Sequence, residues 1–223
     1  MTGRLRGSAG LGPSAAAGDG RGDSNVSGVT RLTRKEQLAR TRERLLDATM
    51  ECLVVHGYAG TTTQRIQDLA GVSRGALLHH FGSKSELLVA AIHHIAGIRL
   101  ETFTREVADL DDSPAALRRM VEAIREIMAG PPFQAALELW AASRTDEQLR
   151  EALLPAERRL GAALRELFAR HSGIADPAAA SLAFESLMAL VRGLELTRNM
   201  RADSAVADRV IDDWFQHVEA LRS

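Results

Sequence analysis

The stretch GYAGTTTQRIQDLAGVSRGALLHHFGSKSELL, residues 57–88, decides the fold because it predicts two short helices joined by a tight turn. A threonine hydroxyl in the run 61–63 can cap the free backbone amides at the start of the first helix. Gly71 opens the turn, and Ser73 is placed to cap a second helix through Phe81. Two short helices around a glycine-containing turn form a helix-turn-helix, although a plain helical corner gives the same pattern.

Helical patterning continues on both sides of this stretch. A helix is predicted from Arg34 to a stop at Gly57, with Cys52 among its periodic apolar residues. Ser83 and Glu86 stand three apart before an apolar run, which predicts a capping box. The remaining helices are predicted over 83–107, 113–129, 131 onward, 146–171 (kinked or split at Pro155), 176–200 and 204–221. No strand-like alternation appears, so the sequence predicts an all-α fold of about nine helices.

Residues 57–88 resemble the signature of the TetR family of DNA-binding transcriptional regulators. The shared features are an aromatic after the helix-ending glycine, a threonine pair, Ala-Gly-Val-Ser, His-Phe and Ser-Lys. The resemblance extends over residues 34–95. It implies a three-helix helix-turn-helix domain over residues 31–82 and a larger helical effector-binding and dimerisation domain over residues 83–223. Residues 1–30 are rich in Gly, Ser and Ala without apolar periodicity, and they are expected to be a disordered tail.

The resemblance also assigns residues that face double-stranded DNA. Arg74 has paired donors that suit guanine O6 and N7, and Gln64 suits adenine. Lys84 is expected to meet a phosphate, and Gly75 gives the backbone close access. The full predicted set is Thr62, Thr63, Gln64, Arg65, Ser73, Arg74, Gly75, Ala76, Leu78, His79, His80 and Lys84.

Two positions depart from the family pattern. Leu78 stands where the family usually has a tyrosine that contacts the DNA backbone, and Gln67 replaces a small residue. Leu78 cannot donate a hydrogen bond, so either a phosphate contact is lost or the side chain meets a thymine methyl. The departures bear on base preference rather than on DNA binding.

Charge is distributed unevenly along the chain. Residues 31–84 hold nine Lys or Arg against five Asp or Glu, whereas residues 85–223 hold sixteen against twenty-two. A basic N-terminal segment on an acidic remainder is typical of a small DNA reader joined to a regulatory body. No run of 18 apolar residues and no signal peptide appear, and Cys52 is the one cysteine. The expected location is therefore the cytoplasm, with no membrane partner.

Apolar residues beyond position 95 lie on helical faces and are expected mostly to form a core. The resemblance implies that some of them line a cavity for an unknown small-molecule effector. The predicted set is Phe103, Met120, Ile124, Met128, Phe133, Leu137, Trp140, Phe168, Phe184 and Met188.

The last two helices have wider apolar coverage than one buried stripe requires. The resemblance implies a homodimer built from these two helices of each chain, reading a palindromic operator. The predicted interface residues are Leu187, Leu190, Val191, Leu194, Val210, Trp214 and Val218.

Other classes of function find little support in the sequence. The adjacent pairs His79-His80 and His93-His94 point apart on a helix, so no metal or cofactor is expected. No nucleophile elbow, phosphate loop or metal pair appears, so an enzyme is disfavoured. A third alternative is a helical adaptor that has lost DNA binding, and Leu78 is its only support in the sequence. The favoured prediction is a repressor that an effector releases from its operator.

Overall fold

The computed structural model describes residues 33–110, 115–200, 203 and 205–222. Within these ranges the chain forms nine α-helices, one short 3₁₀ helix and no strand, so the predicted all-α fold is confirmed. The helices are α1 (Arg34–Gly60), α2 (Thr63–Ala70), α3 (Arg74–His80), α4 (Lys84–Glu106), α5 (Ala116–Ile127), α6 (Pro131–Ser143), α7 (Glu147–His171), α8 (Pro177–Leu196), the 3₁₀ helix η1 (Arg198–Met200) and α9 (Ala205–Arg222).

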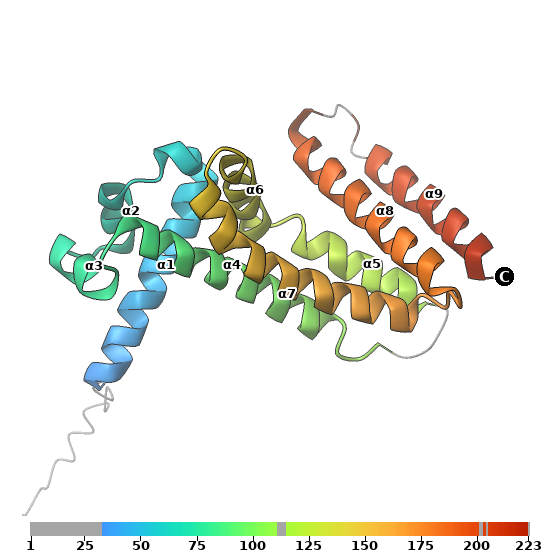
Figure 1. The fold of residues 1–223 in the computed structure, drawn as a ribbon, viewed down its shortest axis with the longest axis horizontal. Helices are drawn as coiled ribbons and strands as arrows, with labels where there is room; N and C mark the ends of the chain where they lie inside the picture. Colours follow the sequence, from blue (N-terminus) through green and yellow to red (C-terminus); the bar gives the residue numbers. More distant parts are fainter. Residues whose placement is uncertain (1–32, 111–114, 201–202, 204, 223) are drawn as a thin grey trace, which may run out of the picture.

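Helices α1, α2 and α3 gather at one end of the molecule and form a head (Figure 1). Leu45 and Cys52 of α1, Ile66 of α2 and Leu77 of α3 are buried together in one apolar cluster. Leu87, near the start of α4, closes that cluster. Because Cys52 is fully buried, desolvation raises the pKa of its thiol, which fits the predicted packing role.

Side-chain caps define the helix-turn-helix as the sequence predicts. Thr62 Oγ accepts a hydrogen bond from the Arg65 amide at 3.3 Å, and Ser73 Oγ accepts one from the Ala76 amide at 3.2 Å. These bonds satisfy backbone donors that a helix start leaves without partners. Gly71 ends α2 in the left-handed region, at φ 60°. The turn between α2 and α3 therefore depends on a residue without a Cβ.

Replacing Gly71 by alanine should destabilise the head by about 1–2 kcal/mol, because left-handed backbone is strained for L-residues. A Cβ there would also lie 3.2 Å from Nη2 of Arg44. Urea unfolding followed by circular dichroism measures the loss. Gly97→Ala on α4 is the matched control, since an added Cβ meets nothing within 4 Å. An equal effect of both substitutions would contradict the role given to the turn.

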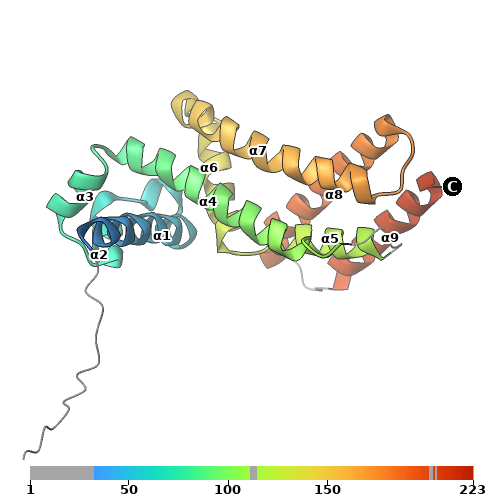
Figure 2. The same cartoon turned by 90° about the horizontal axis from the view of Figure 1, so that it is seen from below.

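Helix α4 belongs to both parts of the molecule. It begins beside the head and continues into the body, where it lies along α7 (Figure 2). A second apolar cluster joins Leu53 of α1 and Ile92 of α4 to Leu139 of α6 and Leu153 of α7. A movement of α4 would therefore change the packing of both the head and the body.

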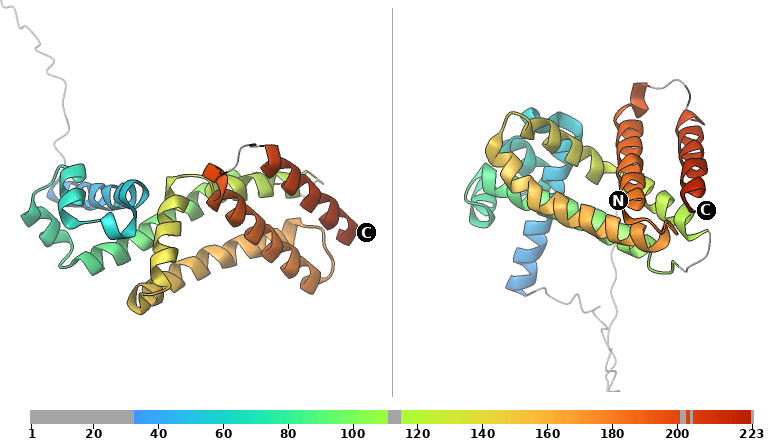
Figure 3. Two further views of the ribbon diagram at one scale, coloured as in Figure 1. Left: turned by 90° about the horizontal axis from the view of Figure 1, so that it is seen from above. Right: turned by 45° about the vertical axis from the view of Figure 1, so that its right-hand side comes forward.

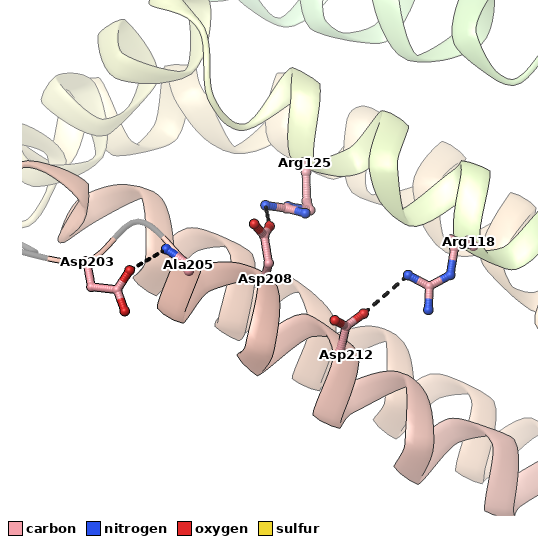
Figure 4. Close-up of polar contacts among 6 residues, drawn as sticks. All are labelled: Arg118, Arg125, Asp203, Ala205, Asp208 and Asp212. Atoms are coloured by element: carbon pink, nitrogen blue, oxygen red, sulfur yellow. Dashed lines mark hydrogen bonds and ion pairs between the residues drawn. The ribbon is translucent and has the colours of Figure 1, made fainter.

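Helices α8 and α9 lie side by side at the end of the molecule away from the head (Figure 3). Phe184 of α8 and Trp214 of α9 pack in the largest apolar cluster, together with Phe168 of α7 and residues of α5. On the solvent side of this contact, Arg125 and Arg118 of α5 bind Asp208 and Asp212 of α9 at 2.7 and 3.3 Å (Figure 4). Apolar packing and ion pairs together fix α9 on the body.

Several element boundaries differ from the sequence predictions. A kink or a split is predicted at Pro155; α7 stays one helix through this residue, so the split is wrong. α8 ends at Leu196 rather than near Met200, because the chain tightens into the 3₁₀ helix η1. Gly57 has non-helical backbone at φ 68°, as a stop predicts, but a further helical turn follows it to Gly60.

At the start of α4, Ser83 caps the Glu86 amide, while Glu86 accepts from the amide of Gly82 rather than of Ser83. The predicted tail (1–30), the Ser113-Pro114 start and the Ser204 cap lie outside the described residues. None of the helices in the described ranges has a segment both long and apolar enough to cross a bilayer.

Candidate DNA-binding surface

The N-terminal end of α3 is open to solvent. Ser73, Arg74 and Gly75 are exposed, Ala76 is half-buried, and Leu77 is the one residue of α3 that is buried. Within the described part of the chain, the Arg74 guanidinium makes no hydrogen bond or ion pair. A short helix anchored by one apolar side chain and open at its first turn can enter a major groove about 12 Å wide. This geometry places Arg74 where its donors can reach a base edge.

The predicted residues at the start of α2 are accessible, and two of them donate side-chain hydrogen bonds within the chain. Thr62, Gln64 and Arg65 are exposed, and Thr63 is half-buried. Arg65 Nη1 donates to the Gly60 carbonyl at 2.6 Å. Gln64 Nε2 donates to Asp68 Oδ1 at 2.8 Å. Each side chain must give up or share an internal bond before it contacts DNA.

The remaining predicted contacts lie at the end of α3 and the start of α4. His79 and Lys84 are exposed, and Lys84 Nζ lies 5.7 Å above the centre of the Tyr58 ring. His80 is half-buried, and burial, then His79 and then Arg42 lower its pKa. Its ring is therefore neutral at neutral pH, and Arg65, Arg74 and Lys84 supply the positive charge of the predicted set.

Leu78 projects from α3 with half of its surface exposed (50%), one position after the buried Leu77. The side chain can therefore reach a partner, and an apolar contact to DNA remains open to it. Gln67, the second departure, is buried against the head instead, so it bears on packing rather than on base reading.

Three side chains that the sequence analysis did not single out hold parts of the head in place, namely those of Arg44, Glu138 and Asp146. Arg44 of α1 donates through Nη2 to the carbonyls of Ala70 and Gly71 and so holds the C-terminus of α2. The Tyr58 amide donates to Glu138 Oε2 at 3.1 Å and its hydroxyl to Asp146 Oδ2 at 3.2 Å. Because the partners in each of these hydrogen bonds are distant in sequence, no local sequence pattern predicts the contacts.

Replacing Gly75 by alanine should weaken DNA binding by about tenfold or more while leaving the fold intact. The added Cβ lies 3.9 Å from Ser73 Oγ, an ordinary contact, so the head accommodates it. In the predicted complex it would also fill the space through which the α3 backbone is expected to approach DNA. Mobility shift at fixed salt measures the affinity, and thermal melting checks the fold. Unchanged affinity would contradict a close backbone approach at this residue.

The ten residues predicted to line an effector cavity lie mainly in the body core. Eight are buried in the largest apolar cluster, and Leu137 and Trp140 pack against it partly exposed. A cavity of about 620 Å³ between α5, α8 and α9 reaches Met128, and another of about 310 Å³ between α6, α7 and α8 reaches Trp140. The effector-cavity assignment stays a prediction for all ten residues.

The seven predicted dimer residues divide into two groups. Leu187, Val191, Trp214 and Val218 are buried in the core of the single chain, so they offer no surface to a partner. Leu190, Leu194 and Val210 are half-buried and can contribute. The predicted interface set leaves out outward-facing apolar side chains of the same helices, which are Leu182, Leu196 and Leu221.

Metal binding finds no counterpart in the geometry. Across the described ranges, no group of three or more His, Cys, Asp or Glu side chains is arranged to hold an ion. His94 pairs instead with Asp47 of α1 at 2.7 Å, a contact between α4 and α1.

Comparison with known proteins agrees with this geometry. Residues 45–91 match the family model described as bacterial regulatory proteins, tetR family. A protein of Mycobacterium bovis named as an uncharacterized HTH-type transcriptional regulator is 36% identical over 121 residues. That match covers 54% of this chain and 62% of the relative, so it spans less than two thirds of that protein.

Two further likenesses cover most of the chain. The HTH-type transcriptional regulator BetI of Paraburkholderia phytofirmans is 32% identical over 187 residues, which are 81% of this chain and 94% of that protein. The crystal structure of a candidate transcriptional regulator from Pseudomonas aeruginosa PAO1 superposes with a TM-score of 0.65 at 26% identity. It covers 85% of this chain and 93% of that one. Both likenesses extend beyond the head into the body.

Proposed function

Because the chain belongs to the TetR family of bacterial regulatory proteins, we propose that it is a sequence-specific DNA-binding transcriptional regulator. Family members regulate transcription and are not enzymes. The observation that carries the proposal is the open first turn of α3, where exposed Arg74 and Gly75 follow the Ser73 cap. We assign the protein to the cytoplasm, where bacterial DNA is found.

The second part of the proposal is a homodimer on a palindromic operator. The outward apolar side chains of α8 and α9, among them Leu182, Leu196 and Leu221, supply a surface far from the head. A twofold axis near these helices leaves both α3 helices free. Two reading heads on one face of DNA need half-sites about one helical turn, 34 Å, apart.

The third part is repression relieved by a small-molecule effector. α4 starts with Lys84 beside α3, and its Phe103 is buried in the body core. A shift of α4 within the body can therefore displace the part of α4 that lies beside the head. An effector weakens DNA binding only through its different affinities for the two shapes of the body. DNA must then weaken effector binding by the same factor.

Selection of genomic fragments by the purified full chain tests the proposal. A regulator should enrich one palindromic motif in the presence of excess sonicated competitor DNA at fixed salt, since affinity depends steeply on salt. Enrichment no greater than that of the competitor would contradict sequence-specific binding and favour a helical adaptor. The control is Arg158→Ala on α7, which leaves Ser73, Arg74 and Gly75 unchanged. It removes one positive charge from an exposed position on the body.

A further inference from the structure

The body encloses a guanidinium group whose bonding is incomplete. Arg99 of α4 is 1% exposed, and its Nη1 donates to Glu157 Oε1 at 3.1 Å. Its Nη2 lies 3.3 Å from the sulfur of Met128, a weak acceptor, and its Nε is buried without a partner. The rings of Phe133 and Trp140 lie 5.2 and 5.8 Å from its Cζ. A buried charge with an unused donor is costly unless something else completes it.

A second arginine meets the same tryptophan. Arg192 of α8 is half-buried, and its Cζ lies 5.3 Å from the centre of the Trp140 ring. Its Nε is also buried without a hydrogen-bond partner, and no described carboxylate lies within ion-pair distance of it. Burial lowers the pKa of Arg99, the carboxylate of Glu157 raises it, and the charge of Arg192 lowers it again. Of the two guanidinium groups only that of Arg99 is paired with a described carboxylate, Glu157, so the positive charge of Arg192 is left without a described ion-pair partner.

A cavity opens beside these groups. It has a volume of about 310 Å³ and lies between α6, α7 and α8. Trp140, Leu153 and Leu154 supply apolar walls, and Glu157, Arg192 and Arg150 supply charge, with Arg150 already paired with Glu147. Arg99 lies behind the wall that Trp140 and Glu157 form. This volume is at the small end of the range for ligand pockets, and the mixture of apolar walls with a few charged groups is typical of them.

We propose that this cavity binds a small organic carboxylate, with its carboxylate group at Arg192, near the buried charge of Arg99, and its apolar body against Trp140 and the two leucines. The proposal rests on the proposed function, for which it names the effector class. A guanidinium group presents parallel donors that match a carboxylate, and a negative charge here removes the local excess of positive charge. A cationic ligand is disfavoured because both guanidinium groups already lie against the Trp140 ring. A neutral ligand is disfavoured as well, because it leaves the local excess of positive charge uncompensated.

The position of this cavity links it to the head. Arg99 belongs to α4, which begins beside α3, and Arg192 belongs to α8, which packs on α7 and α9. A carboxylate at Arg192 also attracts the buried charge of Arg99 and so favours one separation of α4 and α8. Because α4 also packs on α1 of the head, that separation biases the position of the reading helix.

The first test measures binding to the full chain without DNA. Benzoate, phenylacetate and hexanoate are titrated beside benzamide, phenylacetamide and hexanamide, with benzylammonium as the cation. At least one carboxylate should raise the melting temperature in a saturable way and bind at least ten times more tightly than its own amide by calorimetry. Equal binding of acid and amide, stronger binding of the cation, or no shift with any carboxylate overturns the proposal.

Variants then locate the site. Arg192→Gln should weaken the carboxylate at least tenfold, whereas Glu157→Gln should leave its affinity unchanged or increase it, because a competing negative charge is gone. Arg165→Gln is the matched control, since Arg165 also covers an aromatic ring, Phe184, at 5.2 Å but lies outside this cavity. Wild-type affinity in Arg192→Gln overturns the site.

The two proposals fail separately. A chain that binds the carboxylate but no operator overturns the proposed function and leaves the binding site standing. A chain that binds an operator but fails the carboxylate titration overturns this inference alone.

Discussion

Replacing Arg74 by alanine should weaken specific DNA binding by about thirtyfold or more without changing the fold. Each bidentate contact to a base pair contributes about 1–3 kcal/mol of discrimination, and a dimer loses two such contacts, roughly 2–6 kcal/mol in all. The Arg74 side chain is exposed and makes no internal contact among the described residues, so its removal costs the head little stability. Mobility shift on the selected operator and on a scrambled sequence measures both affinities.

The control for this variant is Arg158→Ala, which removes the same charge from an exposed site on α7. Specific binding should fall only for Arg74→Ala, whereas both variants should keep the wild-type melting temperature. Equal losses on the operator and on the scrambled sequence would show that Arg74 meets phosphate and not a base.

Replacing Leu77 by alanine should destabilise the head by about 2–5 kcal/mol, the usual cost of removing a buried leucine side chain. Leu77 is 1% exposed and is the one side chain of α3 that reaches the core of the head. Without it α3 loses its anchor, so operator affinity should fall as well. Urea unfolding followed by circular dichroism measures the first effect, and mobility shift the second.

The neighbouring residue provides the matched control. Leu78 is 50% exposed, so Leu78→Ala should change stability by no more than about 0.5 kcal/mol. Similar losses of stability in the two variants would contradict the orientation of α3, because one residue would then be as buried as the other.

The local features of the head were predictable from the sequence because they depend on neighbours in the chain. Thr62 and Ser73 cap helices whose free amides lie three residues later, and Gly71 supplies the left-handed turn between them. The same rule would have identified Thr33 and Glu36, which form a full capping box at the start of α1. Prolines near the first position of a helix likewise marked the starts of α6 and α8.

Features that depend on tertiary contacts were harder to predict. Apolar periodicity marked Trp214 and Val218 as candidates for a partner surface, although both face the chain's own core. Periodicity shows that a face is apolar but not which neighbour covers it. The Tyr58 bonds to Glu138 and Asp146 join residues far apart in sequence, so they become visible only in the folded chain.

Arg99 did leave a signal in the sequence. It stands on the stripe of Ile92, Ile95 and Phe103, where helical spacing requires an apolar residue. A charged residue in such a position is rarely buried without a partner, so it marks a site that deserves chemical scrutiny. Its partners, Glu157 and Arg192, come from other helices and could not be assigned from spacing.

Footprinting of the full chain on a selected genomic fragment tests the central claim most directly. Two symmetric protected tracts, with centres about 34 Å apart or a whole multiple of that distance, are expected for two α3 helices on one face of the duplex. Arg74→Ala should lose both tracts together. Uniform protection along the fragment, or none at concentrations that shift it, would contradict the claim that this head reads DNA sequence.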